Sequence, residues 1–115
     1  MNYVYLLKDE KRDYCLFKVG FTKDIEKRMK TYATYNPTTQ LINYCQTKEI
    51  SKCKIEKAFQ KEVNKKGFAF VLSNMHTLTE WFAVPYNSEF YNELCTKGLG
   101  AFKNGKNRLI FKINP

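Results

Sequence analysis

The chain has 115 residues, 43% of them hydrophobic and 16% aromatic, which is the size of one domain with a core of its own. Its 20 Lys and Arg residues against 11 Asp and Glu residues give a net charge of +9, which favours polyanionic partners such as nucleic acid, although a basic face that is only solvated has the same charge. The four cysteines form no C-x-x-C pair and the chain has 1 histidine, so a zinc site is poorly supported and free thiols are expected.

The first part of the chain alternates between strand and helix patterns. Residues 3–7 and 16–21 are short apolar, aromatic and β-branched runs separated by a polar stretch, so they predict a β-hairpin. The apolar period then lengthens to that of a helix, which is expected over residues 24–33. A turn at residues 36–39 leads to a predicted strand at residues 41–45.

The second part begins with the longest predicted element, a helix over residues 48–65. Residues 68–72 and 79–84 have the composition of short strands, and residues 88–95 that of a short helix. The segment 97–115 is basic, carries no acidic residue and ends in a predicted apolar strand at 109–111. With neither a secretion signal nor an apolar run near the ~18 residues of a membrane span, we expect an intracellular protein of the cytoplasm or nucleus of a host cell, not secreted and not membrane-bound.

Two charged side chains border the apolar faces of the predicted helices. Arg28 lies one turn from Ile25 and Tyr32, where a half-buried guanidinium either binds an anion or pairs with a structural carboxylate. Glu56 borders the apolar stripe beside Phe59. A carboxylate there can hold a divalent cation whose other sites are filled by water and phosphate, or can be an exposed helical acid.

A tyrosine on the first predicted strand is a third candidate. Tyr3 and Tyr5 alternate with apolar residues and therefore share one face of the sheet. Most strand tyrosines only pack against neighbours. A phenol beside an arginine and a metal-binding carboxylate can instead exchange a proton with water, provided that its pKa, near 10 when unperturbed, is lowered.

Five short motifs follow one another: YVY at residues 3–5, FKVG at 17–20, TKDIEKR at 22–28, KIEKAF at 54–59 and TEWF at 79–82. Their order and spacing resemble the GIY-YIG nuclease superfamily. The likeness is closer to its small branch, the meiotically up-regulated-gene or phage-orf type, in which Y-K-I-G replaces Y-I-G and E-W-F follows the acidic helix.

The resemblance implies an α+β fold with a small central three-stranded antiparallel sheet flanked by helices. The resemblance covers about residues 3–84, and we expect a nuclease domain over residues 1–96, with residues 97–115 as a basic extension packed on the same domain. The implied activity is metal-dependent hydrolysis of DNA phosphodiester bonds, an endonuclease reaction. Tyr5 would act in proton transfer, Arg28 would stabilise phosphate charge, and Glu56 would bind Mg²⁺ or Mn²⁺.

Gly20 would allow a close approach of chain to chain or chain to phosphate. Contacts with nucleic acid are expected from a further set of side chains. This set consists of Lys18, Lys23, Lys27 and Gln60. A homodimer or an accessory partner is expected to supply cutting specificity. Two other functions stay open: a catalytically inactive nucleic-acid-binding module of the same fold, and an interaction protein for an acidic protein partner.

Some positions depart from the branch. Lys18 stands where the larger family has a second tyrosine, and Gln60 stands where the branch commonly has histidine. Glutamine can hold a water molecule but cannot act as a base near neutral pH. His76 is a candidate to compensate in space and Glu80 is a second candidate acid, whereas the aromatic residues 81 and 82 are expected to close the core.

Overall fold

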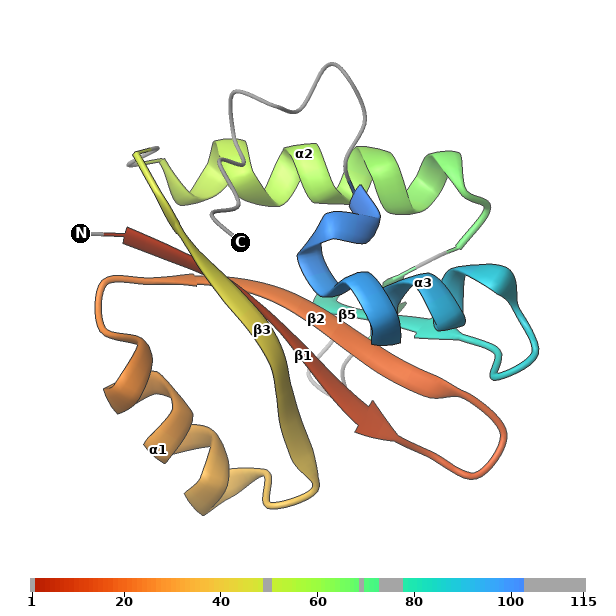
Figure 1. Ribbon diagram of the computed structural model, residues 1–115, viewed down its shortest axis with the longest axis horizontal. Helices are drawn as coiled ribbons and strands as arrows, with labels where there is room; N and C mark the ends of the chain where they lie inside the picture. The colour runs from red at the N-terminus through yellow and green to blue at the C-terminus, as the bar shows by residue number, and fades with distance from the viewer. Residues whose placement is uncertain (1, 49–50, 69, 73–77, 103–115) are drawn as a thin grey trace.

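The computed structural model describes residues 2–48, 51–68, 70–72 and 78–102. In Figure 1, α1 covers one side of the sheet, and α2, α3 and η1 cover the other. The elements in chain order are β1 (Asn2–Glu10), β2 (Cys15–Thr22), α1 (Ile25–Tyr35), β3 (Thr39–Thr47), α2 (Lys52–Lys65), β4 (Phe70–Leu72), β5 (Leu78–Val84), α3 (Glu89–Lys97) and the 3-10 helix η1 (Gly98–Phe102).

The α+β class is confirmed, but three strands are too few. Within the described residues the sheet has five strands in the order β3-β1-β2-β5-β4, and every neighbouring pair is antiparallel. Strands β3, β1 and β2 lie side by side, and β5 adds to the outer edge of β2 from Cys15↔Val84 to Lys18↔Trp81. This pairing satisfies backbone groups of β2 that a three-stranded sheet would leave open.

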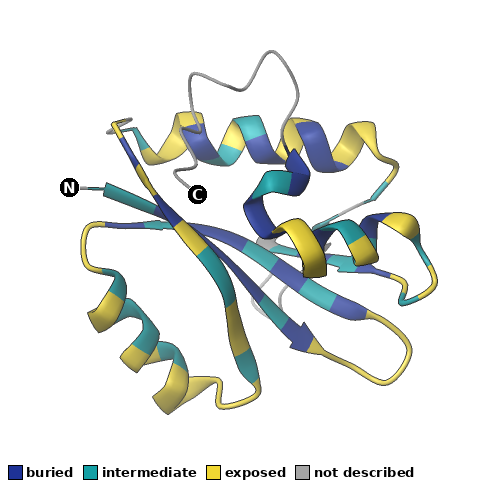
Figure 2. Cartoon of the chain, viewed as in Figure 1, coloured by how far each residue is buried: buried dark blue, intermediate teal, exposed yellow. Residues whose placement is uncertain are grey.

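The main core lies between the sheet and α2, α3 and η1. Because side chains alternate along β1 and β2, Val4, Leu6, Phe17 and Val19 point into this core. Tyr5 and the residues two positions away from it along β1 face α1 instead. Figure 2 shows buried residues concentrated in β1, β2 and the covering helices, whereas α1 has no buried residue. Helix α1 therefore packs more loosely on the sheet than α2 does.

Each helix begins at a residue that caps it. The side chains of Asp24, Ser51 and Ser88 each accept a hydrogen bond from the backbone N–H three residues further on. The Ser51 cap explains why α2 begins at Lys52 and not at residue 48 as expected. Cys53, in the first turn of this helix, is exposed.

The chain after α3 contributes to the core. Phe102 of η1 packs edge-on against Phe59, with ring centroids 4.8 Å apart, and also contacts Phe82 and Phe90. The backbone N–H of Leu99 donates a hydrogen bond of 3.0 Å to the side chain of Asn43 on β3. The predicted strand at residues 109–111 lies outside the described residues. Among the described residues no helix is long and apolar enough to cross a membrane.

Candidate functional site

Tyr5 and Gly20 form the centre of the candidate site. They are cross-strand partners on β1 and β2. A Cβ atom added to Gly20 would overlap the Cζ and hydroxyl oxygen of Tyr5, so the phenol ring lies directly across the glycine. The Tyr5 residue is only 1% exposed. Glycine at position 20 is therefore what leaves room for the ring.

Tyr32 of α1 connects this pair to a cation. Its ring meets that of Tyr5 edge-on, with centroids 6.2 Å apart and planes at 69°. The Nζ of Lys18 lies 5.4 Å from the centroid of the same Tyr32 ring, within the range of a cation–π interaction. Lys18 is two residues before Gly20 on β2 and therefore projects from the same face.

A groove of about 530 Å³ runs along this side of α1. Arg28, one turn before Tyr32, is half-buried and contributes one cation, and Lys27 contributes a second. Asp24 is the acidic residue of the groove, and its Oδ1 accepts the Lys27 N–H at 3.0 Å as the helix cap. The lining residues are Thr22, Asp24, Lys27, Arg28, Thr31, Tyr32, Tyr35 and Asn36. Lys23 is exposed in the turn between two of them.

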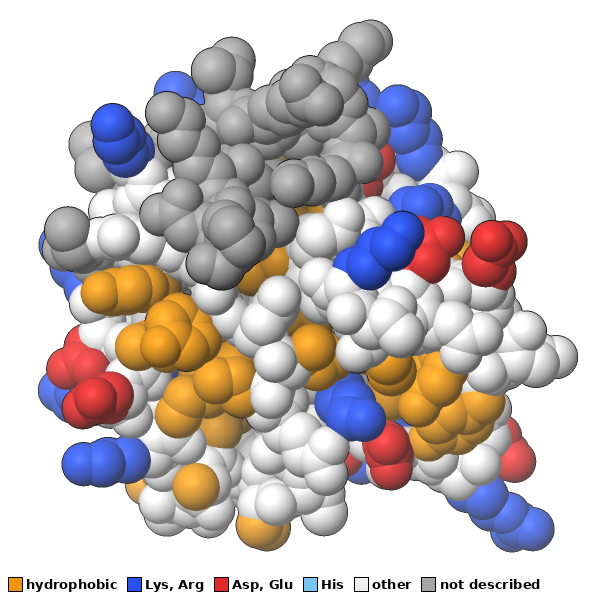
Figure 3. Space-filling model, in the orientation of Figure 1, with side chains coloured by type: hydrophobic (Ala, Val, Ile, Leu, Met, Phe, Trp, Pro, Cys, Tyr) orange, Lys and Arg blue, Asp and Glu red, His pale blue; other side chains and the backbone are white. Residues whose placement is uncertain are grey.

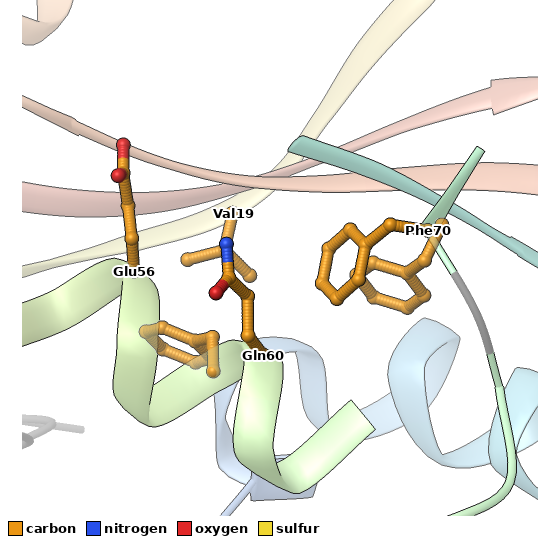
Figure 4. Close-up of a pocket in the computed structure, with 6 residues that line it drawn as sticks. Val19, Glu56, Gln60 and Phe70 are labelled. Atoms are coloured by element: carbon orange, nitrogen blue, oxygen red, sulfur yellow. The ribbon is translucent and has the colours of Figure 1, made fainter. Parts of the chain in front are cut away.

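Glu56 and Gln60 lie on α2, across the sheet from the groove. Together with Val19, Phe59, Phe70 and Phe82 they line a cavity of about 10 Å³. Figure 4 shows the side chains of Glu56 and Gln60 extending from α2 toward the strands, and Val19 extending from β2 toward them. A cavity of this size holds one water molecule at most, so it is not a substrate pocket.

The surroundings of the Glu56 carboxylate are partly apolar and partly basic. Its side chain is 25% exposed, and its Oε1 lies 3.6 Å from the Nζ of Lys52, one turn earlier on α2. Aromatic residues of the cavity wall occupy one flank. Gln60, one turn later, is exposed at the rim.

The predicted site residues thus lie on two sides of one short stretch of β2. On the side of α1, Tyr5 and Lys18 both contact Tyr32, and Arg28 lines the groove that Tyr32 shares. Glu56 and Gln60 meet the other side at Val19. The pairing of β2 with β5 ends at Lys18, so in the described part of the chain no strand continues along this edge of β2 from Val19 onward. The two groups of side chains therefore flank the same open edge of β2.

The sequence profile of the T5orf172 domain family matches residues 2–94. The chain belongs to this family. The matched segment contains every predicted site residue of the T5orf172 domain and ends within α3. No curated protein and no solved structure matches the chain.

A metal ion on this T5orf172 domain would have a small set of protein ligands. The described residues include no group of three or more His, Cys, Asp or Glu side chains that could enclose an ion. Glu56 offers one carboxylate at the edge of an apolar cavity. One carboxylate fits a Mg²⁺-like ion, which keeps several water ligands and takes others from phosphate, and does not fit a structural zinc site.

Several expectations about neighbouring residues need revision. Phe82 is buried in the core as expected, but Trp81 is half-buried and pairs across the strands with Lys18, so it faces away from that core. His76 and the side chain of Glu80 lie outside the described residues. Tyr35 was not predicted as a site residue, because an aromatic residue at the end of a short helix carries no local signal of its exposure.

Proposed function

We propose that this T5orf172 domain is a metal-dependent DNA endonuclease of the GIY-YIG type, which hydrolyses phosphodiester bonds. The proposal is carried by the placement of a phenol and two cations, Tyr5, Lys18 and Arg28, on the α1 side of the sheet, and of the Glu56 carboxylate on the other side of β2 at Val19. The order of the sequence motifs and the family match over residues 2–94 support it further.

The cations bind the substrate. The guanidinium of Arg28, a half-buried residue of the groove, binds a phosphate through two parallel N–H groups and stabilises the negative charge that develops during hydrolysis. Lys18 projects from the same side and is a second phosphate contact. Lys23 and Lys27, at the start of α1, bind the neighbouring backbone phosphates through charge alone.

The phenol of Tyr5 exchanges a proton with the attacking water. Its burial under α1 and across Gly20 fixes the ring, so the hydroxyl is held in one position before substrate binds. Glu56 holds the divalent cation, Mg²⁺ or Mn²⁺, which when bound supplies positive charge to the phosphoryl oxygens. Gln60 at the rim orients a water molecule through its amide.

Supercoiled plasmid tests this proposal. The protein is incubated with plasmid in Mg²⁺, Mn²⁺ or EDTA, alongside Glu56→Gln, Arg28→Ala and the control Glu93→Gln, which changes a partly exposed acid on α3. We expect metal-dependent nicking that each site variant lowers on the order of a hundredfold or more and that the control leaves unchanged. Nicking that persists in EDTA, or equally in Glu56→Gln, would exclude the proposed site.

One observation favours a second candidate function, a catalytically inactive module of the same fold that binds nucleic acid. Position 60, at the rim beside Glu56, holds a glutamine where the resembled branch commonly has histidine. The inactive module predicts salt-sensitive DNA binding without nicking under any metal. If the chain were an interaction protein for an acidic protein partner, neither salt-sensitive DNA binding nor nicking would be expected.

A further inference from the structure

Tyr35 is the most exposed large hydrophobic residue among those that the structure describes. It is 78% exposed, compared with 52% for Tyr44 and 41% for Tyr14. It lies at the C-terminal end of α1 and lines the same groove as Arg28 and Tyr32. A solvent-exposed aromatic ring at a groove that also contains cations is typical of sites where the ring stacks against a flat ligand.

The groove offers charge and aromatic surface in a regular series. Arg28, Tyr32 and Tyr35 follow at spacings of four and three residues, so they lie along one face of α1 over roughly 10 Å. Lys27 adds a second cation beside Arg28. The volume of about 530 Å³ lies in the range of small-ligand sites, roughly 300–1,000 Å³.

We propose that this groove binds single-stranded DNA, with a base stacked on Tyr35 and the adjoining phosphates on Arg28 and Lys27. The inference rests on the proposed action on DNA and names the form of DNA that the α1 side accepts. Stacking on an aromatic ring needs an open base face, which an unpaired strand offers and a duplex hides between neighbouring base pairs. The strand would lead along α1 toward Tyr32, which contacts both Tyr5 and Lys18.

Two other surfaces lack this combination. The exposed face of α2 carries a row of lysines at positions 54, 57, 61 and 65, but the aromatic residue of that helix, Phe59, is buried. The opposite side of α1 meets β3 in a mostly apolar hollow of about 340 Å³ lined by Ile25, Glu26, Met29, Lys30, Leu41 and Tyr44, in which the charge of Lys30 is offset by that of Glu26. Figure 3 shows orange side chains gathered beside α1 and β3. Lysines without exposed rings suit a duplex backbone, and an apolar hollow offers phosphate little charge.

Binding in EDTA separates this inference from cleavage. Fluorescence anisotropy compares a labelled single strand with the duplex of the same sequence for the full chain, Tyr35→Ala, Tyr35→Phe and the control Tyr14→Ala, an exposed tyrosine in the β1–β2 turn. We expect Tyr35→Ala to weaken single-strand binding by about fivefold or more and duplex binding by less than about twofold. Tyr35→Phe keeps the ring and should bind as the unchanged chain does, as should Tyr14→Ala.

A second measurement reports stacking itself. A single strand containing 2-aminopurine should lose fluorescence on binding the unchanged chain and keep more of it on binding Tyr35→Ala. Unchanged single-strand affinity in Tyr35→Ala, or an equal loss on duplex, would overturn the inference even if the protein nicks plasmid. Single-strand binding that depends on Tyr35 in a protein that never nicks would overturn the endonuclease proposal and leave this inference standing.

Discussion

The phenol ring of Tyr5 lies across the α-carbon of Gly20 on the neighbouring strand, in the space that a side chain at Gly20 would occupy. On its other side the ring meets Tyr32 of α1 edge-on. Tyr5 is thus held between a strand and a helix, with almost no solvent contact. The glycine acts as a positioning residue for the phenol.

Gly20→Ala should therefore disturb both fold and site. The added methyl group has no free space, so the Tyr5 ring must move, and we expect the free energy of unfolding to fall by about 1–3 kcal/mol. Urea denaturation measures this loss, and plasmid nicking below the transition measures the effect on activity. Gly100→Ala is the matched control, because the atom nearest to its added Cβ, the Cβ of Lys97, would lie at 3.6 Å, an ordinary van der Waals distance. An unaltered Gly20→Ala protein would mean that Tyr5 does not occupy this position.

Tyr5→Phe separates the ring from its hydroxyl. The phenylalanine ring keeps the packing against Gly20 and Tyr32, so the free energy of unfolding should fall by no more than about 1.5 kcal/mol, the size of one hydrogen bond. Nicking should fall about a hundredfold or more, because the proton-transfer group is gone. The free energy of unfolding and the nicking rate are both measured on one preparation. Retained nicking would remove Tyr5 from the proposed chemistry and leave it a packing residue.

The core extends beyond the segment that matches the T5orf172 family. Phe102 lies after that segment, which ends at residue 94, yet its ring contacts Phe59, Phe82 and Phe90. Phe102→Ala should lower the free energy of unfolding by about 3–5 kcal/mol in urea denaturation. The exposed-site variant Tyr14→Ala should stay within about 0.5 kcal/mol of the unchanged chain. Equal stability of the two variants would place η1 outside the folding unit.

The elements that sequence patterns predicted well are those with local signals. The β1–β2 hairpin and the end of α2 followed from apolar spacing, and Asp24 and Ser88 mark helix starts that the structure confirms as caps. Residues 68–72 and 79–84 were predicted as strands, but the three-stranded sheet that the resemblance implied was too small, because the pairing of β5 with β2 joins segments more than 60 residues apart, as in Lys18↔Trp81. No local pattern encodes such a partner.

In the candidate site too, local spacing predicts some features, whereas others depend on how distant segments pack. The position of Glu56 beside an apolar stripe follows from helical spacing, and the structure places it at the rim of an aromatic-walled cavity. The contact of Lys18 with Tyr32 depends on how α1 sits on the sheet, which only the folded chain decides. The exposure of Tyr35 depends on the same placement.

Two buried thiols predict a loss of stability at high pH. Burial raises the pKa of Cys15 and of Cys45 from 9.0 to about 11. At pH 8 and below both thiols are almost fully protonated in the folded and unfolded states. Between about pH 9 and 11 they ionise only in the unfolded state, so the free energy of unfolding should fall, by about 1–3 kcal/mol per thiol.

Urea denaturation from pH 8 to 11 measures this effect. The double variant Cys15→Ala/Cys45→Ala serves as the comparison, because lysines and tyrosines titrate in both proteins and cancel in the difference. The variant should be less stable at pH 8 and should lose less stability as the pH rises. Parallel curves for the two proteins would show that these thiols do not titrate differently on folding.

Position 60 offers a test by gain of function. Gln60 is exposed at the rim beside Glu56, so histidine should be accommodated there with a stability change within about 0.5 kcal/mol. An imidazole can act as a base where glutamine cannot, so we expect Gln60→His to raise the nicking rate by about tenfold or more above pH 7. The rate should fall as the pH drops through about 6.5, where the imidazole becomes protonated. Residue 61 is next to residue 60 but outside the cavity, so the nicking rate of Lys61→His should not fall in this way at low pH. If the nicking rate of Gln60→His also showed no such fall, residue 60 would lie away from the reacting water.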